Sequence, residues 1–366
     1  MINAKTTKYL LIIAGIVLYT CSVAQTITVK QDGTGNFTTI QAAINAAWPG
    51  DTVLVWPGTY YENLNIENKN LVLGSLTLTT GDVSYRYQTV IDGHDSESCV
   101  YVEYSDLFEI NGFTLQHGIG HWTNGGCGGI WFFCSDGNII NCVVKNNQVN
   151  NSAGGVGFTI SDAFLSNTSI HHNRCKDQGG GIYISHASNI VFDSVNRCSV
   201  YMNYASQGTD IFMTGGDSLY AYLDTLTVDF YDRYYVALVD NSESGNPNNK
   251  IKLDVRHTYL QPVVSDLYVS PWGNNNNSGT SPDQPLKNIW YASLLAKPDS
   301  LNPLTVYIDT GTYALSVNDE WFPIGGRDYL SFKGGGKYKA VLDAENYGPH
   351  FRSANGIKNY TLSGMS

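Results

Sequence analysis

The sequence predicts an all-β chain: a right-handed parallel β-helix with an N-terminal capping helix, followed by the start of a second β-helix. Three observations lead to this fold class. The middle of the chain repeats, the apolar residues within each repeat alternate as in strands, and the composition favours strands and turns. The 366 residues include 37 Gly and 25 Tyr, whereas only 14% are charged, so little of the chain suits long surface helices.

Two independent markers carry the repeat. The first is a Gly-Gly pair followed by alternating apolar residues, which recurs at a spacing of 26 residues at Gly128, Gly154 and Gly180, with a looser copy at 210–213. The second is an apolar residue three places before an Asn, and its copies end at Asn147, Asn173 and Asn203. The breaks are Gly, Asn, Ser and Asp, and no stretch of the repeat shows a helical period. Each copy therefore predicts one turn of a coil of short strands.

A single turn of such a coil cannot bury its own apolar face, so successive turns must stack about 4.8 Å apart. We expect the Asn series at a turn, where the amides hydrogen-bond the backbone and the next coil. An open coil also needs a cap, for which residues 39–47 are the best helix candidate, with a strand at 52–56 after it. Two inward ladders are predicted: Ile130, Val156, Ile182 and Ile211, and beside it Phe132, Phe158, Ile184 and Met213.

Residues 1–24 are predicted to be a signal peptide. Lys5 and Lys8 precede an apolar run, small residues follow it, and we expect cleavage after Ala24. The alternative is a lipid anchor at Cys21, against which Thr20 stands where lipoprotein signals have a small residue. No later run is apolar for long enough to span a membrane, so a secreted or cell-surface protein is expected.

The charge and the cysteines limit the partners. A net charge of −11 argues against nucleic acid as a ligand. Six cysteines follow the signal peptide, between Cys99 and Cys198, without the spacing of a zinc site. Buried unpaired thiols and one or two disulfides are both open interpretations. No cofactor is predicted, no convergent set of carboxylates supports Ca²⁺, and a monomer is expected.

The N-terminal opening carries a family resemblance. Residues 29–44, Val-Lys-Gln-Asp-Gly-Thr-Gly-Asn-Phe-Thr-Thr-Ile-Gln-Ala-Ala-Ile, followed by Gly-Asp-Thr-Val at 50–53 and Pro-Gly-Thr-Tyr at 57–60, resemble the opening of pectin methylesterases and other pectin-lyase-like proteins. The resemblance covers roughly residues 27–93 and implies the parallel β-helix. The catalytic signatures of the esterases are Gln-Asp-Thr-Leu, Asp-Phe-Ile-Phe-Gly and Leu-Gly-Arg-Pro-Trp, and none is intact here. Asp210 lies in a faint echo of the second, which is more simply the fourth repeat strand.

A second opening begins at Asp266 and resembles another family of secreted bacterial β-helix domains. Aligning the two openings pairs residues 52–60 with 305–313, and 90–92 with 341–343. The predicted domains are therefore a β-helix over 25–265 and the beginning of a second over 266–366, which is too short for a capped solenoid and looks truncated. Residues 217–265 keep strand character but lose the period. They are either final rungs or a β-rich edge cover, with a loop at 245–249.

Two outer surfaces supply candidate sites. Trp131, Tyr183 and Phe212 are the outward neighbours of the Ile ladder and would stack sugar rings, with Gly157 leaving a gap; the alternative is a loop that covers them. The second surface has Lys145 one rung from His171, followed by His172 and Arg174. A polysaccharide lyase must neutralise a uronate carboxylate and remove the α-proton, which these residue types would suit, although histidines at such a turn also fit solvated surface. Weaker candidates on a loop are His117, His121 and Trp122.

Two functions follow from these observations. The first is a secreted or cell-surface β-helix that engages extracellular polysaccharide, or another cell-surface component, as a non-catalytic binding or structural module. The repeats and the missing catalytic motifs favour it. The second is a polysaccharide lyase or hydrolase acting on an acidic, pectin-like or alginate-like glycan, with lyase chemistry favoured over ester hydrolysis. Analogy of fold is a weak warrant for activity, so the sequence leaves open whether the chain is an enzyme.

Overall fold

The computed structural model describes residues 24–120, 126–185, 187–215, 218–230, 232–239, 250–336, 338–346, 348–353 and 357–366. The expectations for the signal peptide before residue 24, for Cys21, for His121 and Trp122 and for the loop at 245–249 fall outside these ranges. Within them, no helix is long and apolar enough to cross a membrane.

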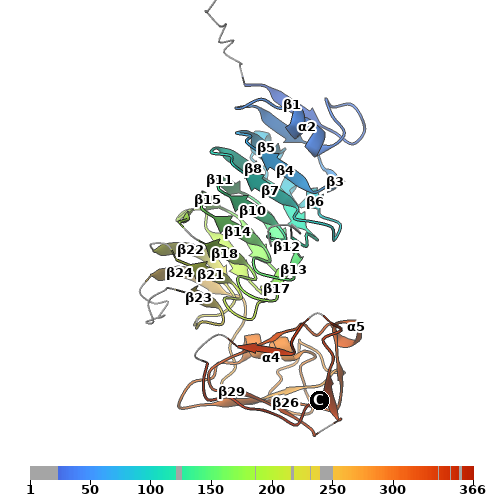
Figure 1. Cartoon of the computed structure of the whole chain (residues 1–366), viewed down its shortest axis with the longest axis vertical. Helices are drawn as coiled ribbons and strands as arrows, with labels where there is room; N and C mark the ends of the chain where they lie inside the picture. Colours follow the sequence, from blue (N-terminus) through green and yellow to red (C-terminus); the bar gives the residue numbers. More distant parts are fainter. Residues whose placement is uncertain are drawn as a thin grey trace, which may run out of the picture.

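Three parallel sheets form the walls of a right-handed β-helix, as predicted (Figure 1). Within each repeat the chain passes through sheet C, then sheet A, then sheet B. Sheet A contains, in spatial order, β1 (Thr26–Val29), β2 (Thr52–Val55), β5 (Val72–Ser75), β8 (Phe108–Asn111), β11 (Gly137–Ile140), β15 (Asp162–Ser166) and β19 (Asn189–Phe192). Sheet B contains β3 (Gly58–Tyr61), β6 (Thr89–Asp92), β9 (Thr114–Gln116), β12 (Val143–Lys145), β16 (Ser169–His171), β20 (Cys198–Tyr201), β22 (Leu219–Leu226) and β24 (Ile251–Thr258). Sheet C contains β4 (Leu64–Glu67), β7 (Val100–Glu103), β10 (Ile130–Phe133), β14 (Val156–Thr159), β18 (Ile182–Ser185), β21 (Ile211–Thr214) and β23 (Val236–Val239), and the short pair β13 (Gln148–Val149) and β17 (Arg174–Cys175) lies beside them.

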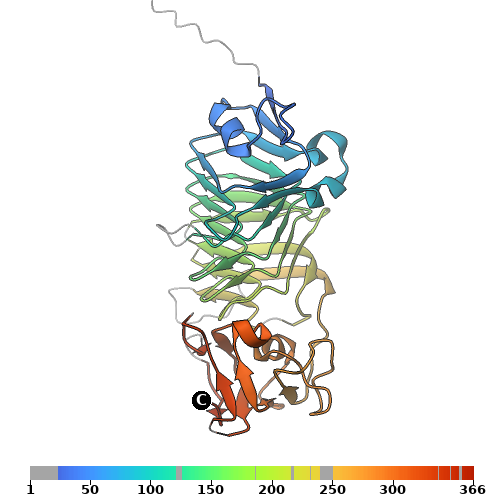
Figure 2. The ribbon, with the colours of Figure 1, turned by 90° about the vertical axis from the view of Figure 1, so that its right-hand side faces the viewer.

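A helix covers the N-terminal end of the coil. Helix α2 (Ile40–Ala46) occupies the position predicted for a cap and buries Ile40, Ala43 and Ile44 against the first rungs. The carboxylate of Glu62 accepts hydrogen bonds from the backbone N–H groups of Ile40 at 2.8 Å and Gln41 at 2.9 Å, which satisfies two donors that a helix start leaves free. Helix α3 (Thr77–Thr80) and the 3₁₀ helix η1 (Val83–Tyr87) project from the coil between β5 and β6 (Figure 2).

Both predicted apolar ladders are present in the expected register. Strands β10, β14, β18 and β21 pair so that Ile130, Val156, Ile182 and Ile211 lie one above another, and all four are fully buried. The neighbouring ladder begins with Phe132 and Phe158, whose rings stack with centroids 5.5 Å apart. The period of the sequence therefore specified both the fold and the register of sheet C.

The Asn ladder closes the turn after sheet B, which confirms the structural role predicted for it. The amide nitrogen of Asn147 donates to Asn173 at 2.9 Å, and the amide nitrogen of Asn173 donates to Asn203 at 3.1 Å. The same nitrogens also donate to backbone carbonyls of the preceding rung, at Leu115 and Val144. All three Asn side chains are buried, so each polar group finds its partner inside the protein.

The cysteines of the described chain are unpaired. Five of the six are buried, and Cys134 is half-buried. Burial raises the pKa of Cys99, Cys175 and Cys198 to about 12, and that of Cys142 to about 11. These groups remain neutral thiols near neutral pH and act as core residues rather than nucleophiles.

The stretch from 217 to 265 supplies final rungs rather than an edge cover, wherever the structure describes it. Strand β22 pairs with both β20 and β24 in sheet B, and β23 extends sheet C beyond β21. The period is lost because β22 and β24 are longer than the strands before them and the register shifts between Cys198 and Ser199.

A second set of parallel strands lies beyond these rungs (Figure 1). We call residues 266–366 the C-terminal module. One sheet of this module contains β25 (Leu267–Val269), β26 (Leu304–Ile308), β29 (Leu330–Gly334) and β32 (Leu362–Ser363), and two pairs join β27 (Gly311–Tyr313) to β30 (Ala340–Leu342) and β28 (Ile324–Gly326) to β31 (Phe351–Ser353). Its helices are α4 (Ile289–Leu295) and α5 (Leu315–Asn318).

The two openings use the same structural devices. Glu320 accepts from the first two backbone N–H groups of α4, each at 2.9 Å, as Glu62 does for α2. The hydroxyl of Tyr60 donates to Trp56 four residues earlier, and that of Tyr313 donates to Asp309 four residues earlier. The strand pairs β3–β6 and β27–β30 match the sequence alignment of the two openings.

A buried polar joint connects the C-terminal module to the last rungs of the first β-helix. The guanidinium of Arg327 is only 1% exposed; it donates to backbone carbonyls of Ser293 and Ala296 and pairs with Asp232 at 3.0 Å. The hydroxyl of Tyr235 donates to the Leu294 carbonyl at 2.6 Å. These contacts cover the end of the first coil with helix α4 and the segment around it.

The Asn ladder yields a stability prediction. Replacing Asn173 with Ala removes its side-chain bonds to both neighbouring Asn residues and leaves a buried backbone group without its partner, so unfolding in urea should cost about 3 kcal/mol less. Asn150→Ala, at an exposed position one turn away, is the matched control and should change stability by less than about 0.5 kcal/mol. Equal midpoints for the two variants would contradict a stabilising role of the ladder.

Candidate functional site

The predicted aromatic platform on sheet C is not exposed. The register does align Trp131, Gly157, Tyr183 and Phe212 across four strands, but Trp131 is 7% exposed and Phe212 only 1%. The expected gap at Gly157 is filled, because a β-carbon there would lie 3.2 Å from both the indole of Trp131 and the side chain of Cys127. The alternative in which adjoining chain covers the row is therefore the one observed.

These aromatic residues pack in the protein instead. Trp131 lies in a cluster with Tyr101, Cys127 and Ala153, and Phe212 stacks on Tyr183 with ring centroids 5.5 Å apart. Of the residues that pack against Trp131, Tyr101 lies in β7 of the neighbouring rung, Cys127 precedes β10 and Ala153 follows β13. Tyr183 alone stays half-buried, so this row offers no platform for sugar rings.

The outer row of sheet B carries the ionisable groups that the sequence singled out. Register pairs Asp92 with Gln116, Gln116 with Lys145, Lys145 with His171, and His171 with Tyr201. The predicted neighbourhood of Lys145 and His171 is therefore confirmed. The row crosses five rungs on one face of the β-helix.

His171 of this row and His172 at the turn after it form a pair that is uncharged near neutral pH. Their Nδ1 atoms are 2.8 Å apart, and the imidazole of His171 stacks on Tyr201 at 4.9 Å. Burial lowers the pKa of His171 to about 4, helped by repulsion from His172 and Lys145, and burial also lowers the pKa of His172. Neutral imidazoles do not neutralise a uronate carboxylate, so the charge expected of them in a lyase is missing.

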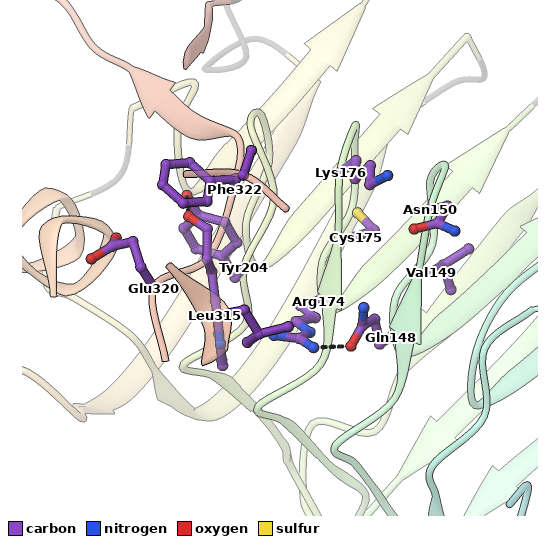
Figure 3. A pocket seen from close by; sticks show the side chains of 12 residues that line it. Gln148, Val149, Asn150, Arg174, Cys175, Lys176, Tyr204, Leu315, Glu320 and Phe322 are labelled. Carbon is purple, nitrogen blue, oxygen red and sulfur yellow. Dashed lines mark hydrogen bonds between the residues drawn. The ribbon is translucent and has the colours of Figure 1, made fainter. Parts of the chain in front are cut away.

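Arg174 is separated from the histidines by the turn that Asn173 occupies. Its guanidinium lies over the ring of Trp321 at 5.1 Å and hydrogen-bonds Gln148, so it faces the C-terminal module (Figure 3). The pocket at this joint has a volume of about 30 Å³, which suits ordered water and excludes a sugar ring. The structure thus brings Lys145, His171 and His172 together and places Arg174 in an intramolecular contact.

A carboxylate–imidazole pair that the sequence analysis underrated lies on the same row. Nδ1 of His117 is 2.9 Å from Oδ2 of Asp92; the aspartate is buried, whereas the His117 side chain is 44% exposed. Burial opposes ionisation of Asp92, but hydrogen bonds from Gln116, the His94 amide and His117 keep its pKa below the usual value. His117 lies in the connection between rungs, as predicted, at the left-handed turn position equivalent to that of His172, with φ of 57° and 54° respectively.

An open groove of about 550 Å³ follows the outer face of sheet A. Its floor is a row of outward side chains in register, one from each rung of β5, β8, β11, β15 and β19: Val72, Glu109, Asn138, Phe164 and Val191. Phe164 is half-buried, and Val191 and Leu107 are 48% and 75% exposed. Apolar surface therefore remains open to solvent along several rungs.

Acidic groups form the rim of this sheet A groove. Asp106 and Asp136 lie in the turns that precede β8 and β11, Asp162 is the first residue of β15, and Glu109 rises from the floor. Asp136 accepts the backbone N–H of Asp162 at 2.8 Å, which uses one of its carboxylate oxygens to join two rungs. Within the described residues, no group of three or more His, Cys, Asp or Glu side chains is arranged to hold a metal ion.

The groove was missed by sequence reasoning although its signal was present. Asn138 and Phe164 are separated by the same 26 residues as the Gly-Gly markers, and each precedes an inward Ile or Leu. Following every outward position of the repeat, rather than only those beside the Gly-Gly pairs and the Asn turns, would have found the row. An arrangement of an apolar floor with carboxylates and an amide can hold a hydroxyl-rich chain through both packing and hydrogen bonds.

Asp210, the faint echo of an esterase nucleophile, is an interior residue. It is fully buried, and its Oδ1 accepts from the amide of Asn203 at 3.2 Å, so it ends the Asn ladder. Burial raises the pKa of Asp210 to about 7, although the hydrogen bonds that its carboxylate accepts act in the opposite direction. No substrate reaches a carboxyl group in this position.

Fold and surface define the chain as a right-handed parallel β-helix with an open groove on one wall. The solved structures similar to it include a pectin methylesterase from Aspergillus niger, with a TM-score of 0.37, 12% identity, and coverage of 93% of this chain and 84% of that one. Pectin methylesterase from carrot gives 0.29, 13%, 92% and 87%, and a pectin methylesterase mutant in complex with a hexasaccharide gives 0.32, 13%, 91% and 93%. No protein-family profile and no curated protein sequence matches the chain. The likeness concerns the fold and does not extend to activity.

The raised pKa of Asp210 predicts a pH-dependent stability. Between about pH 4 and pH 7 the unfolded chain loses this proton while the folded chain keeps it, so stability falls as the pH rises, by on the order of 4 kcal/mol over the interval. Asp210→Asn keeps the acceptor for Asn203 and should remove that fall in urea titrations at a series of pH values. Asp283→Asn, at an exposed position, is the control, and an unchanged pH profile in Asp210→Asn would show that Asp210 is already ionised in the fold.

Proposed function

We propose that this chain binds polysaccharide in the sheet A groove and acts as a non-catalytic module. The observation that carries the proposal is the row of outward side chains from Val72 to Val191, which combines exposed apolar surface with polar side chains that face the same groove. Pyranose rings present both kinds of surface, with apolar C–H faces and a periphery of hydroxyls. A groove lined only by apolar groups would match only the C–H faces, and a groove lined only by charged groups would match only the hydroxyls.

The spacing of the rungs supports a polymeric ligand. Successive strands of a sheet lie about 4.8 Å apart, so equivalent side chains of the groove recur at that interval along the axis. A pyranose residue in an extended glycan advances by a similar distance. A glycan chain lying along the axis would therefore meet one set of floor and rim groups per sugar residue.

The same proposal places the protein outside the cell, secreted or at the cell surface. The support is the sequence of residues 1–24, with its two lysines, apolar run and small residues before the expected cleavage site. Extracellular polysaccharide is then the ligand that the groove would meet.

Phe164 provides the first test of the proposal. Phe164→Ala should weaken glycan binding roughly tenfold, because the ring supplies apolar contact worth about 1.4 kcal/mol in the middle of the groove. Titration calorimetry with the best binder from a panel of pectate, alginate, chondroitin and neutral glycans would measure it, with thermal unfolding as a check on the fold. Trp272→Ala removes an 84% exposed ring outside the groove and should bind normally. Equal affinities for both variants would remove Phe164 from the site.

The second candidate function is a polysaccharide lyase or hydrolase, and the Asp92–His117 pair favours it. A carboxylate that holds Nδ1–H of an imidazole leaves Nε2 as the basic atom, which is the arrangement of a general base. Lys145, one rung beyond Gln116, would supply the positive charge that an acidic glycan requires. This set replaces the combination of His172 and Arg174 that the sequence suggested.

His117→Asn tests this enzymatic alternative. Asn tolerates the left-handed backbone at this turn, and loss of a general base should reduce any activity at least a hundredfold. His172→Asn is the matched control, since it sits at the equivalent turn with a similar φ angle. Ultraviolet absorbance of unsaturated ends reports lyase action, and released reducing sugar reports hydrolysis. Full activity in His117→Asn would exclude the pair, and silence of the native chain across the panel would leave the binding function alone.

A further inference from the structure

We infer that the sheet A groove selects glycans that carry protonated amines, such as polymers of glucosamine with free amino groups, over uronate polymers. The inference rests on the proposed polysaccharide binding and adds the charge class of the ligand. The groove lining is acidic. Its carboxylates are those of Asp106, Glu109, Asp136 and Asp162, and no described lining residue is Lys, Arg or His.

The carboxylates are placed to meet a chain rather than a single ion. Asp136 accepts the backbone N–H of Asp162 on the next rung, and Asp162 in turn accepts the backbone N–H of Asn189 on the rung after that, so both carboxylates are held in position. Glu109 is oriented by the amide groups of Asn111 at 3.1 Å and Asn138 at 3.5 Å. Acceptors fixed in this way recur along the axis with the spacing of sugar residues, and each offers its remaining lone pairs to a charged N–H donor.

The apolar floor is an independent observation that points to a ligand. Leu107 and Val191 are exposed and Phe164 is half-buried within the same groove, so the carboxylates do not simply form a solvated acidic face. A small cation would leave this surface uncovered. An amino sugar covers it with its C–H face while its ammonium group meets the rim.

Charge complementarity decides between classes of glycan. A uronate polymer would place one negative charge per residue beside these carboxylates, on a chain whose net charge is already −11. The cationic groups that would suit it, Lys145 and Arg174, belong to sheet B and to the module joint. A neutral glycan meets neither repulsion nor attraction and should bind with intermediate affinity.

The experiment compares oligomers of equal length on the full chain by calorimetry. The probes are glucosamine oligomers with free amines, their N-acetylated counterparts, oligogalacturonate with and without Ca²⁺, and an oligolysine of equal charge. A buffer at about pH 5.5 keeps the amines of the glucosamine oligomers protonated. The double variant Glu109→Gln, Asp136→Asn keeps hydrogen-bond acceptors and removes two charges, and Glu67→Gln, outside the groove, is its control.

We expect the free-amine oligomers to bind at least tenfold more tightly than the acetylated ones. The double variant should weaken this binding roughly fivefold without affecting the acetylated oligomers, and added salt should do the same. Equal affinity for acetylated and free-amine oligomers would overturn the inference and leave the proposed function standing. Tighter binding of oligogalacturonate in the presence of Ca²⁺ would also overturn the inference. Binding of oligolysine as tightly as the amino sugar would overturn it too. If no glycan binds at all, the proposed function itself fails.

Discussion

The register between successive rungs is the constraint on which every other feature of this β-helix depends. A strand pair offset by one residue would turn core positions such as Val156 outward and expose the apolar ladders, as follows from the alternation of side chains in a strand. Two elements prevent this. The stacked apolar residues bury their area only in one alignment, and the Asn ladder closes its amide bonds only when Asn147, Asn173 and Asn203 lie directly above one another. The turn and the core therefore agree on one register.

The repeated opening of the chain separates scaffold residues from specific ones. Glu62 and Glu320 both cap a helix, and Asp92 and Asp343 both accept the backbone N–H two residues later, at 3.0 and 2.9 Å. Such shared contacts belong to the fold. Asp92 also accepts a hydrogen bond from Gln116 and contacts His117, and these two contacts join it to the candidate site on sheet B.

Much of the fold followed from the sequence because a solenoid is locally encoded. Each rung contacts the next at a fixed distance along the chain, so the spacing from Ile130 to Val156 already contains the tertiary contact. The capping helix, the ladders and the neighbours Lys145 and His171 were predicted correctly for that reason.

Burial of Trp131 was not predictable in this way, since it depends on the path of non-repeating segments near Cys127 and Ala153. The direction of Arg174 was missed for a related reason: its partner Trp321 lies 147 positions further along the chain, where no period relates the two residues. The groove on sheet A was missed for a different reason. Its row of side chains obeys the period, but exposed side chains carry no hydrophobic signal that would distinguish a binding surface from the solvated face of an ordinary strand.

A surface composed of one residue per rung has no fixed length of its own. In an enclosed pocket the walls converge from distant elements, and adding chain disrupts them. In the sheet A groove each rung contributes a complete cross-section, so duplication or loss of a 26-residue unit changes the length of the surface while leaving its chemistry and the core intact. In the proposed complex, the number of ligand units in contact would then follow the number of rungs, and no single contact would need to change.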